Sequence, residues 1–151
     1  MANVLIVDDA AFMRGSLKYI LEQNGHSVVG EAADGAEALK LYKQHKPDLV
    51  TLDVLMKGVD GLSGLKAIKK HDSGAKVIMV TALGQELMQK EASQLGASGY
   101  IRKPFSVAAI IHEVDERILH LSYRFFRKAP TVKPHKVISH ACKKFLALVP
   151  I

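Results

Sequence analysis

The sequence predicts an α/β domain in which helices cover both faces of a doubly wound, parallel five-stranded sheet. Two observations lead to this expectation. Short apolar runs alternate five times with segments whose apolar residues recur at helical spacing. The first of these runs, residues 3–7, is apolar after its first residue, which is typical of a strand buried on both faces. Five strand–helix units within about 120 residues favour right-handed crossover connections.

The first two units follow this pattern in order. The helix after the first strand is expected to stop at Asn24-Gly25, a pair that commonly ends helices. A short second strand is expected over residues 27–30, followed by a helix over residues 35–45. That helix should end before Pro47, because the residue preceding a proline disfavours helical geometry.

The third unit begins with an apolar strand over residues 48–52, which leads directly into Asp53. A glycine-rich stretch follows, and we expect it to be a loop. The loop leads into a helix that carries Leu65 and Ile68 on its apolar face.

The last two units cover the rest of the predicted domain. A strand over residues 76–80 ends at Thr81, and a helix is expected over residues 85–95. A short fifth strand follows over residues 99–101. Ser106 is expected to cap a final helix, whose apolar stripe continues to Phe125, so we expect that helix to run to about Lys128.

The net charge of +6 is unevenly distributed along the chain. Residues 1–120 contain all 15 acidic residues and 14 of the 21 lysines and arginines, which leaves this part at −1. Residues 121–151 contain the remaining seven basic residues and no acid. A nucleic acid or an acidic membrane surface could therefore be attracted only by this C-terminal part.

No apolar run approaches the roughly 20 residues that a membrane span needs. The short apolar run after Met1 is closed by two aspartates and favours a strand over a signal peptide. The single cysteine, Cys142, excludes an internal disulfide and fits a reducing compartment. We therefore expect a cytoplasmic protein.

Chemically active side chains stand where the predicted strands end. Asp8 and Asp9 follow the first strand, Asp53 the third, Thr81 the fourth and Lys103 the fifth. These positions share one edge of a parallel sheet, and carboxylates crowded there repel each other unless a hard cation such as Mg²⁺ joins them. Each aspartate alone would more often be a helix N-cap. Together, the residues form a cradle for a phosphoryl group, with a carboxylate as a nucleophile.

These residues resemble the receiver domains of two-component response regulators, and the resemblance covers residues 1 to about 120. Residues 10–14 and 82–86 look most similar to the single-domain, CheY-like chemotaxis regulators. The matching segments are Val4-Leu5-Ile6-Val7-Asp8-Asp9, Asp48-Leu49-Val50-Thr51-Leu52-Asp53, Met56 with Asp60-Gly61, Val80-Thr81-Ala82 and Lys103-Pro104-Phe105.

The resemblance implies a flavodoxin-like strand order, 2-1-3-4-5, and a phosphorylation site. Asp53 would accept the phosphoryl group of a sensor histidine kinase of the CheA type. Asp9, Asp53 and the backbone carbonyl of Leu55 would ligate Mg²⁺ directly, and Asp8 mostly through water. Lys103 would bind the phosphoryl oxygens.

The resemblance also implies a switch. Thr81 would move toward the phosphoryl group and Tyr100 would turn inward, which would alter a target-binding face formed by the fourth helix, the fifth strand and the fifth helix. For Tyr100 the alternative is an ordinary half-buried strand aromatic. A downstream target protein and a phosphatase are the expected partners, and any catalysis would be limited to self-phosphorylation and self-dephosphorylation.

Three positions bear on how this chain differs from its family. Lys57 stands where receivers usually have proline, which frees the loop and adds a positive charge, so we expect weaker Mg²⁺ binding. Alternatively, Lys57 is an ordinary exposed lysine of a loop, without an effect on the metal site. Leu55 and Leu83 flank the expected path of the hydrolytic water, so we expect slow loss of the phosphoryl group.

We expect residues 1–120 to form the receiver domain and residues 121–151 a basic C-terminal extension. Pro130 and Pro134 mark a linker, and residues 135–149 form a basic amphipathic segment that is marginal as an isolated helix. This segment would pack on its own or a neighbouring receiver, which includes a dimer through the extension, or bind a partner protein, membrane surface or nucleic acid.

Three functions compete. The first is a phosphorylation switch that acts by protein binding, in chemotaxis. The second is a transcriptional or nucleic-acid-binding regulator that acts through the basic tail, although nucleic acid is the less favoured partner. A phosphatase-like hydrolase ranks last, because the chain is short of segments that could form a substrate-binding cap.

Overall fold

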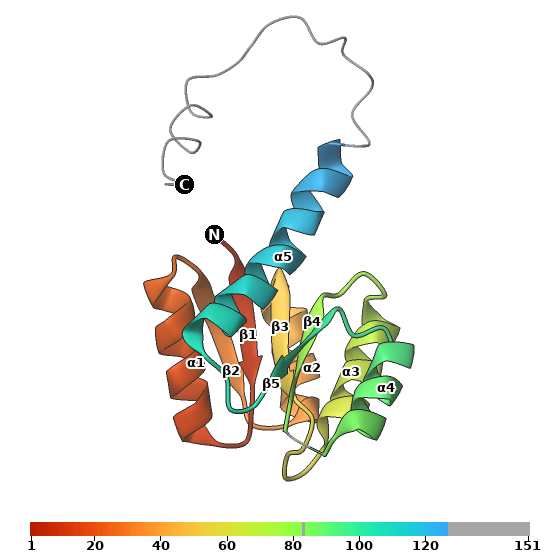
Figure 1. The fold of residues 1–151 in the computed structure, drawn as a ribbon. Coiled ribbons are helices and arrows are strands. Elements are labelled where there is room, and N and C mark those ends of the chain that lie inside the picture. Colours follow the sequence, from red (N-terminus) through yellow and green to blue (C-terminus); the bar gives the residue numbers. More distant parts are fainter. Residues whose placement is uncertain (83, 127–151) are drawn as a thin grey trace, which may run out of the picture.

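The computed structural model describes residues 1–82 and 84–126, and for residues 120–126 it describes the helix but not the side chains. Five parallel strands form one sheet in the order β2-β1-β3-β4-β5 (Figure 1). This confirms the predicted fold class and strand order. The strands are β1 (Asn3–Val7), β2 (Ser27–Ala32), β3 (Leu49–Asp53), β4 (Val77–Thr81) and β5 (Gly99–Arg102).

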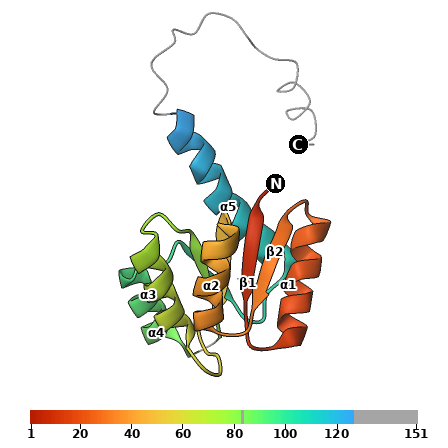
Figure 2. The ribbon, with the colours of Figure 1, turned by 180° about the vertical axis from the view of Figure 1, so that it is seen from behind.

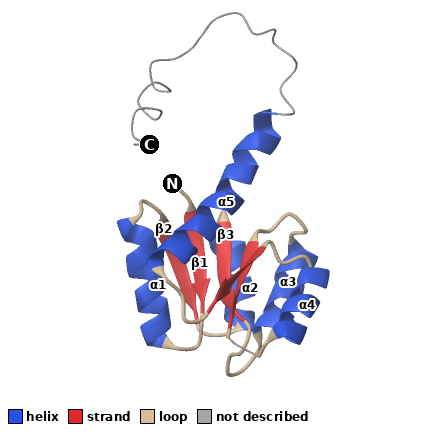
Figure 3. Cartoon of the chain, viewed as in Figure 1, coloured by secondary structure: helices blue, strands red, loops and turns tan. Residues whose placement is uncertain are grey.

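Helices lie on both faces of the sheet. One face is covered by α1 and α5, and the other by α2, α3 and α4, as the two opposite views show (Figures 1 and 2). All strands point toward the same edge of the sheet (Figure 3). The helices are α1 (Ala11–Gln23), α2 (Gly35–His45), α3 (Gly61–His71), α4 (Glu86–Gln94) and α5 (Val107–Phe126).

Each face of the sheet has its own apolar core, because successive side chains of a strand point to opposite faces. Val4 and Ile6 of β1 pack with Leu17 of α1 in one core, while Leu5 and Val7 belong to the other. The side chains of these four β1 residues are all buried. Burying a side chain of this size contributes about 1.5–3 kcal/mol. The continuously apolar strands therefore result from burial on both faces.

Polar side chains cap three helices and fix where they begin. Asp34 Oδ1 accepts hydrogen bonds from the backbone N–H groups at the start of α2, the closest over 2.8 Å. Asp60 Oδ1 accepts from Ser63 N over 2.7 Å at the start of α3. Ser106 Oγ accepts from Ala109 N over 3.1 Å, as predicted. Each cap satisfies a helix N–H that has no partner within the helix.

One strand extends further than predicted. The pairing of β2 with β1 continues from Gly30 to Ala32, after a register shift between Val4 and Leu5. The sequence did not show this extension, because β2 is an edge strand whose residues are mostly half-buried and include Glu31. Helix α5 runs across residue 120, the predicted domain boundary, to Phe126.

The predicted helix end at Lys128, the proline linker and the amphipathic segment 135–149 lie outside the described residues. So does any dimer contact that this extension would make. Within the described part of the chain, no helix is long and apolar enough to cross a membrane.

Candidate functional site

The register of the sheet brings the predicted site residues to one edge. Val7 pairs with Leu52, so Asp8, the next residue, is level with Asp53 at the end of β3. Across the other side of β3, Asp53 pairs with Val80. Thr81 therefore ends β4 one residue further along, and Lys103 follows directly after β5.

Asp8, Asp9 and Asp53 form a carboxylate cluster. One oxygen from each side chain lies within 4.8 Å of the others. Asp8 is only 1% exposed and Asp53 7%, whereas Asp9 is more open to solvent. Ligands that are all oxygen, at least one of them accessible to water, are what Mg²⁺ prefers. The cluster therefore fits a magnesium ion.

Lys103 joins the two buried carboxylates. Its Nζ lies 3.0 Å from Asp8 Oδ2 and 3.0 Å from Asp53 Oδ2. The backbone N–H of Lys103 donates to the Thr81 carbonyl over 2.6 Å, which fixes the start of the loop after β5. The ammonium group thus sits between carboxylates that come from β1 and β3.

The Asp53 carboxylate and the Lys103 ammonium group differ in how well each is neutralised by its surroundings. Burial raises the pKa of Asp53, with a further contribution from Asp8, and these effects outweigh the hydrogen bond and charge of Lys103. Burial opposes the charge of Lys103 as well, yet its pKa is raised, because two carboxylates accept hydrogen bonds from it. Among the described residues, Lys103 is the cation that pairs with Asp53, and it also pairs with Asp8. A buried, incompletely neutralised carboxylate is the kind of group that functional sites retain.

Arg14 fixes the loop that carries Asp8 and Asp9. Its Nη1 donates to the backbone carbonyl of Asp8 over 2.8 Å, and its Nε lies 3.6 Å from Glu31 Oε2. The Asp8 side chain also accepts from Ala10 N over 2.8 Å. Sequence reasoning noted Arg14 only within a matching segment. Its place in the first turn of α1 was the one signal that it could reach back to this loop.

The loop between β3 and α3 closes over the site. The N–H of Lys57 donates to Asp9 Oδ2 over 3.1 Å. A Cβ atom on Gly61 would lie 1.9 Å from the carbonyl oxygen of Asp53, so only glycine fits there. Neither contact was foreseen from the sequence. Leu55 is 52% exposed two residues after Asp53, and the ligand role of its carbonyl stays a prediction.

The two predicted switch residues lie on neighbouring strands. Thr81 is buried at the end of β4. Tyr100 of β5 is partly buried, and its hydroxyl donates to the carbonyl of Gln89 in α4 over 3.1 Å. This bond links β5 to α4, and the switch role of Tyr100 stays a prediction. Leu83, predicted to hinder the hydrolytic water, lies outside the described residues.

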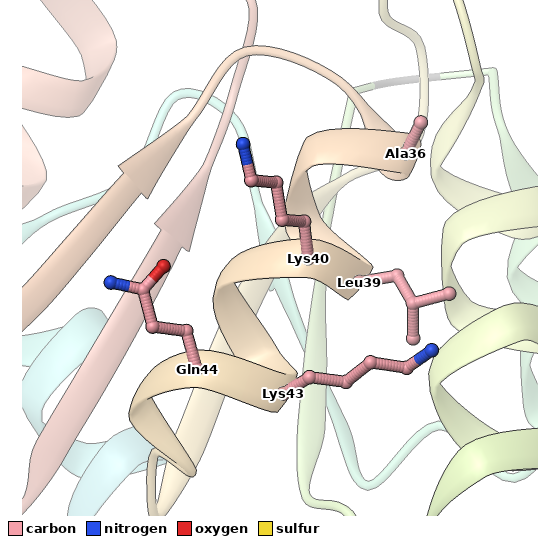
Figure 4. Close-up of a pocket in the computed structure, with 5 residues that line it drawn as sticks. All are labelled: Ala36, Leu39, Lys40, Lys43 and Gln44. Atoms are coloured by element: carbon pink, nitrogen blue, oxygen red, sulfur yellow. The ribbon is translucent and has the colours of Figure 1, made fainter.

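A separate hollow of about 540 Å³ on α2 is no competing site. Its lining shares no residue with the carboxylate cluster. Figure 4 shows that Lys40 and Lys43 point away from each other, so their charges do not converge on a common ligand. The hollow is lined by Ala36, Leu39, Lys40, Lys43 and Gln44.

Residues 4–115 match the response regulator receiver domain family, and the chain belongs to this family. Within it, the chain is a receiver of the CheY-like type. It is 47% identical over 116 residues to the chemotaxis protein CheY of Bacillus subtilis, which covers 77% of this chain and 97% of that protein. It is 45% identical over 114 residues to CheY of Thermotoga maritima, covering 76% and 95% respectively.

Solved structures agree with this assignment. The crystal structure of the CheX-CheY-BeF3-Mg²⁺ complex from Borrelia burgdorferi has a TM-score of 0.70 and 39% sequence identity, and the match covers 80% of this chain and 88% of that one. The family and type predicted from the sequence are thereby confirmed. Receivers of this type are signalling switches.

Proposed function

We propose that this chain is a phosphorylation switch in chemotaxis, in which Asp53 accepts a phosphoryl group from the phosphohistidine of a CheA-type sensor kinase. The observation that carries the proposal is the position of Lys103 Nζ, 3.0 Å from both Asp8 and Asp53. An Asp53 oxygen would attack phosphorus, the P–N bond to histidine would break, and the lysine would stabilise the added charge. Similarity to CheY proteins supports the assignment to chemotaxis.

Asp9, Asp53 and the Leu55 carbonyl would hold Mg²⁺ directly, and Asp8 mostly through water. The bound ion would neutralise charge on the carboxylates and on the phosphoryl oxygens. Once Asp53 carries the phosphoryl group, Lys103 would exchange its contact with the Asp53 carboxylate for one with a phosphoryl oxygen. Its second bond, to Asp8, would keep the ammonium in place during this exchange.

The output would be a change in a protein-binding face built from α4, β5 and α5. Thr81 would move toward the phosphoryl group, and Tyr100 would turn inward into the vacated space. That turn would break the bond from Tyr100 to Gln89 and loosen α4 from β5. Leu87 on α4 is 85% exposed, which supports this face as a contact site for a target protein.

We place the protein in the cytoplasm, where it would meet the kinase, the target and a phosphatase. Beyond self-phosphorylation and self-dephosphorylation, we expect no catalytic activity. Residues 1–120 would carry the whole reaction, because every group named in it lies within them.

Intact mass spectrometry tests the proposal. The protein is incubated with Mg²⁺ and phosphoramidate, a small P–N phosphoryl donor, and compared with Asp53→Asn. Asp115→Asn is the matched control, because Asp115 is an exposed aspartate on α5, outside the cluster. We expect one phosphoryl adduct on the native chain and the control, and none on Asp53→Asn. An adduct on Asp53→Asn, or none on the native chain, would refute the assignment.

A further inference from the structure

An apolar groove of about 580 Å³ opens beside the carboxylate site. One wall comes from the start of α1, with Phe12 and Met13, and the other from the segment after β5, with Pro104 and Phe105. Phe12 is 82% exposed although it is a large aromatic. Lys103, the partner of Asp53, also lines the groove. An exposed aromatic side chain in an apolar groove is typical of a docking surface.

We propose that residues 135–149 of the same chain dock in this groove. Ile138, Cys142, Phe145 and Val149 are spaced by four, three and four residues, so a helical conformation would place them on one face. That apolar face matches the aromatic walls of the groove in chemistry. In the same conformation the lysines at positions 136, 143 and 144 would lie on the opposite face, toward solvent.

The chain is long enough for this return. Helix α5 begins just after the groove wall and carries the chain past the opposite edge of the sheet (Figures 1 and 2). Its 20 residues span about 30 Å. Residues 127–137 could extend over roughly 36 Å. The segment that begins at Ile138 can therefore reach back along α5 to the groove.

Charge favours the same occupant. Residues 121–151 carry seven basic side chains and no acid, whereas residues 1–120 have a net charge of −1. The Asp8, Asp9 and Asp53 carboxylates lie next to the groove. Lys103 pairs with both Asp8 and Asp53. A basic segment is therefore attracted toward this acidic edge over longer range, while its apolar face makes the contact.

A docked segment would contact Lys103, which lines the groove. The docking itself does not depend on phosphorylation and can be measured on the unmodified protein.

Cys142 is the single cysteine, so a label can be placed elsewhere in a Cys142→Ser background; Ser139 lies beside the proposed docking face, not on it. A nitroxide is attached to Ser139→Cys in the full-length, ¹⁵N-labelled Cys142→Ser chain, and amide signals are compared before and after the label is reduced with ascorbate. We expect the amide signals of Met13, Ser16 and Phe105 to lose about half of their intensity or more, because the segment is docked in most of the molecules. Unchanged signals there, or losses centred on α4 instead, would overturn the proposal.

Two exposed aromatics on α1 provide matched variants. Phe12→Asp puts a charge into the groove and should abolish the signal loss, whereas Tyr19→Asp, also on α1 and 67% exposed, should leave it intact. Equal effects of the two variants would contradict the proposed position. A mixture of nitroxide-labelled chains with ¹⁵N-labelled Cys142→Ser chains should show no loss. A loss in that mixture would mean that the occupant comes from a second copy, which overturns docking within one chain.

Discussion

The backbone N–H of Lys57 donates a hydrogen bond to Asp9 Oδ2 over 3.1 Å, and so links the loop after β3 to the loop after β1. A proline at position 57 would have no N–H to donate. The resemblance to receivers leads us to expect proline there, so this contact sets the chain apart. It involves Asp9, the most exposed carboxylate of the cluster.

Lys57→Pro is expected to bind Mg²⁺ more tightly than the native protein. The substitution removes a hydrogen bond that occupies a carboxylate oxygen of Asp9, together with a positive charge near the site. A hydrogen bond to a charged group is worth about 1.5 kcal/mol, so we expect a gain of up to about tenfold in affinity. Isothermal titration calorimetry with Mg²⁺ measures it.

Lys57→Ala is the control for this prediction, because it removes the charge and keeps the N–H. If the hydrogen bond dominates, Lys57→Ala should bind Mg²⁺ like the native chain. Equal affinities for the native chain and Lys57→Pro would show that Lys57 does not weaken the metal site.

Asp53→Asn should stabilise the protein at neutral pH when no divalent cation is present. Because burial raises the pKa of Asp53, its ionisation costs the folded state more than the unfolded chain. The cost is present above the raised pKa and disappears as the pH falls through it toward 3.8, the usual pKa of an aspartate. We expect a gain on the order of 1 kcal/mol at pH 7.

Urea unfolding at several pH values tests this expectation. The difference between Asp53→Asn and the native chain should shrink from pH 7 to pH 4. Mg²⁺ should also stabilise the native chain more than the variant, since it binds the folded site. A native chain that is more stable than Asp53→Asn in EDTA at pH 7 would contradict the prediction.

The same substitution should have opposite effects at two glycines. In Gly61→Ala the new Cβ would meet the Asp53 carbonyl at 1.9 Å, so we expect a loss of about 3 kcal/mol or more and a disturbed site. Gly15 is exposed within α1, where a Cβ would meet nothing within 4 Å. Gly15→Ala should stabilise the chain by up to about 1 kcal/mol. Thermal unfolding of both variants tests this prediction. Similar shifts of the unfolding temperature in the two variants would contradict the close approach at Gly61.

Leu55→Asn should shorten the lifetime of the phosphorylated protein. Leu55 lies two residues after Asp53 and is half-exposed, so its apolar side chain can hinder an approaching water. An amide would orient that water instead, and a lower barrier of about 1.4 kcal/mol would mean about tenfold faster hydrolysis. The decay of the adduct mass after removal of the donor measures the rate. Fast decay in the native protein would show that Leu55 is no barrier.

Tyr42→Phe should destabilise the protein in a pH-dependent way. The Tyr42 hydroxyl donates to Asp72 Oδ2 over 2.6 Å, and this bond is the largest cause of the lowered pKa of Asp72. The resulting stability is complete above the unfolded pKa of about 3.8 and is lost as the pH falls through the lowered folded value.

At pH 7 we expect Tyr42→Phe to lose about 1 kcal/mol, the usual value of such a bond, and much less at pH 2. Chemical unfolding at the two pH values measures the difference. Tyr19→Phe, at an exposed position on α1, is the control and should change little. A loss that is equal at both pH values would point to packing of the Tyr42 ring instead.

Local sequence patterns were enough to predict the sheet, its helices and the residues at its carboxyl edge. The apolar run from Val4 to Val7 and the helical stripe around Leu17 are local patterns. They are visible in the sequence because a buried strand or a buried helix face must be apolar. Asp8 and Asp53 could be brought together in advance, because parallel strands must end at the same edge. The family resemblance then supplied their expected roles.

The contacts between the loops at that edge could be seen only in the folded chain. Lys57 and Asp9 are 48 residues apart, and Lys103 and Asp8 are 95 apart. No periodicity links such pairs, because their contacts depend on the path of the backbone between strands and on side-chain direction. The close approach at Gly61 and the reach of Arg14 to the Asp8 carbonyl arise in the same way. Local preference sets the elements, and packing sets the distances that give the site its chemistry.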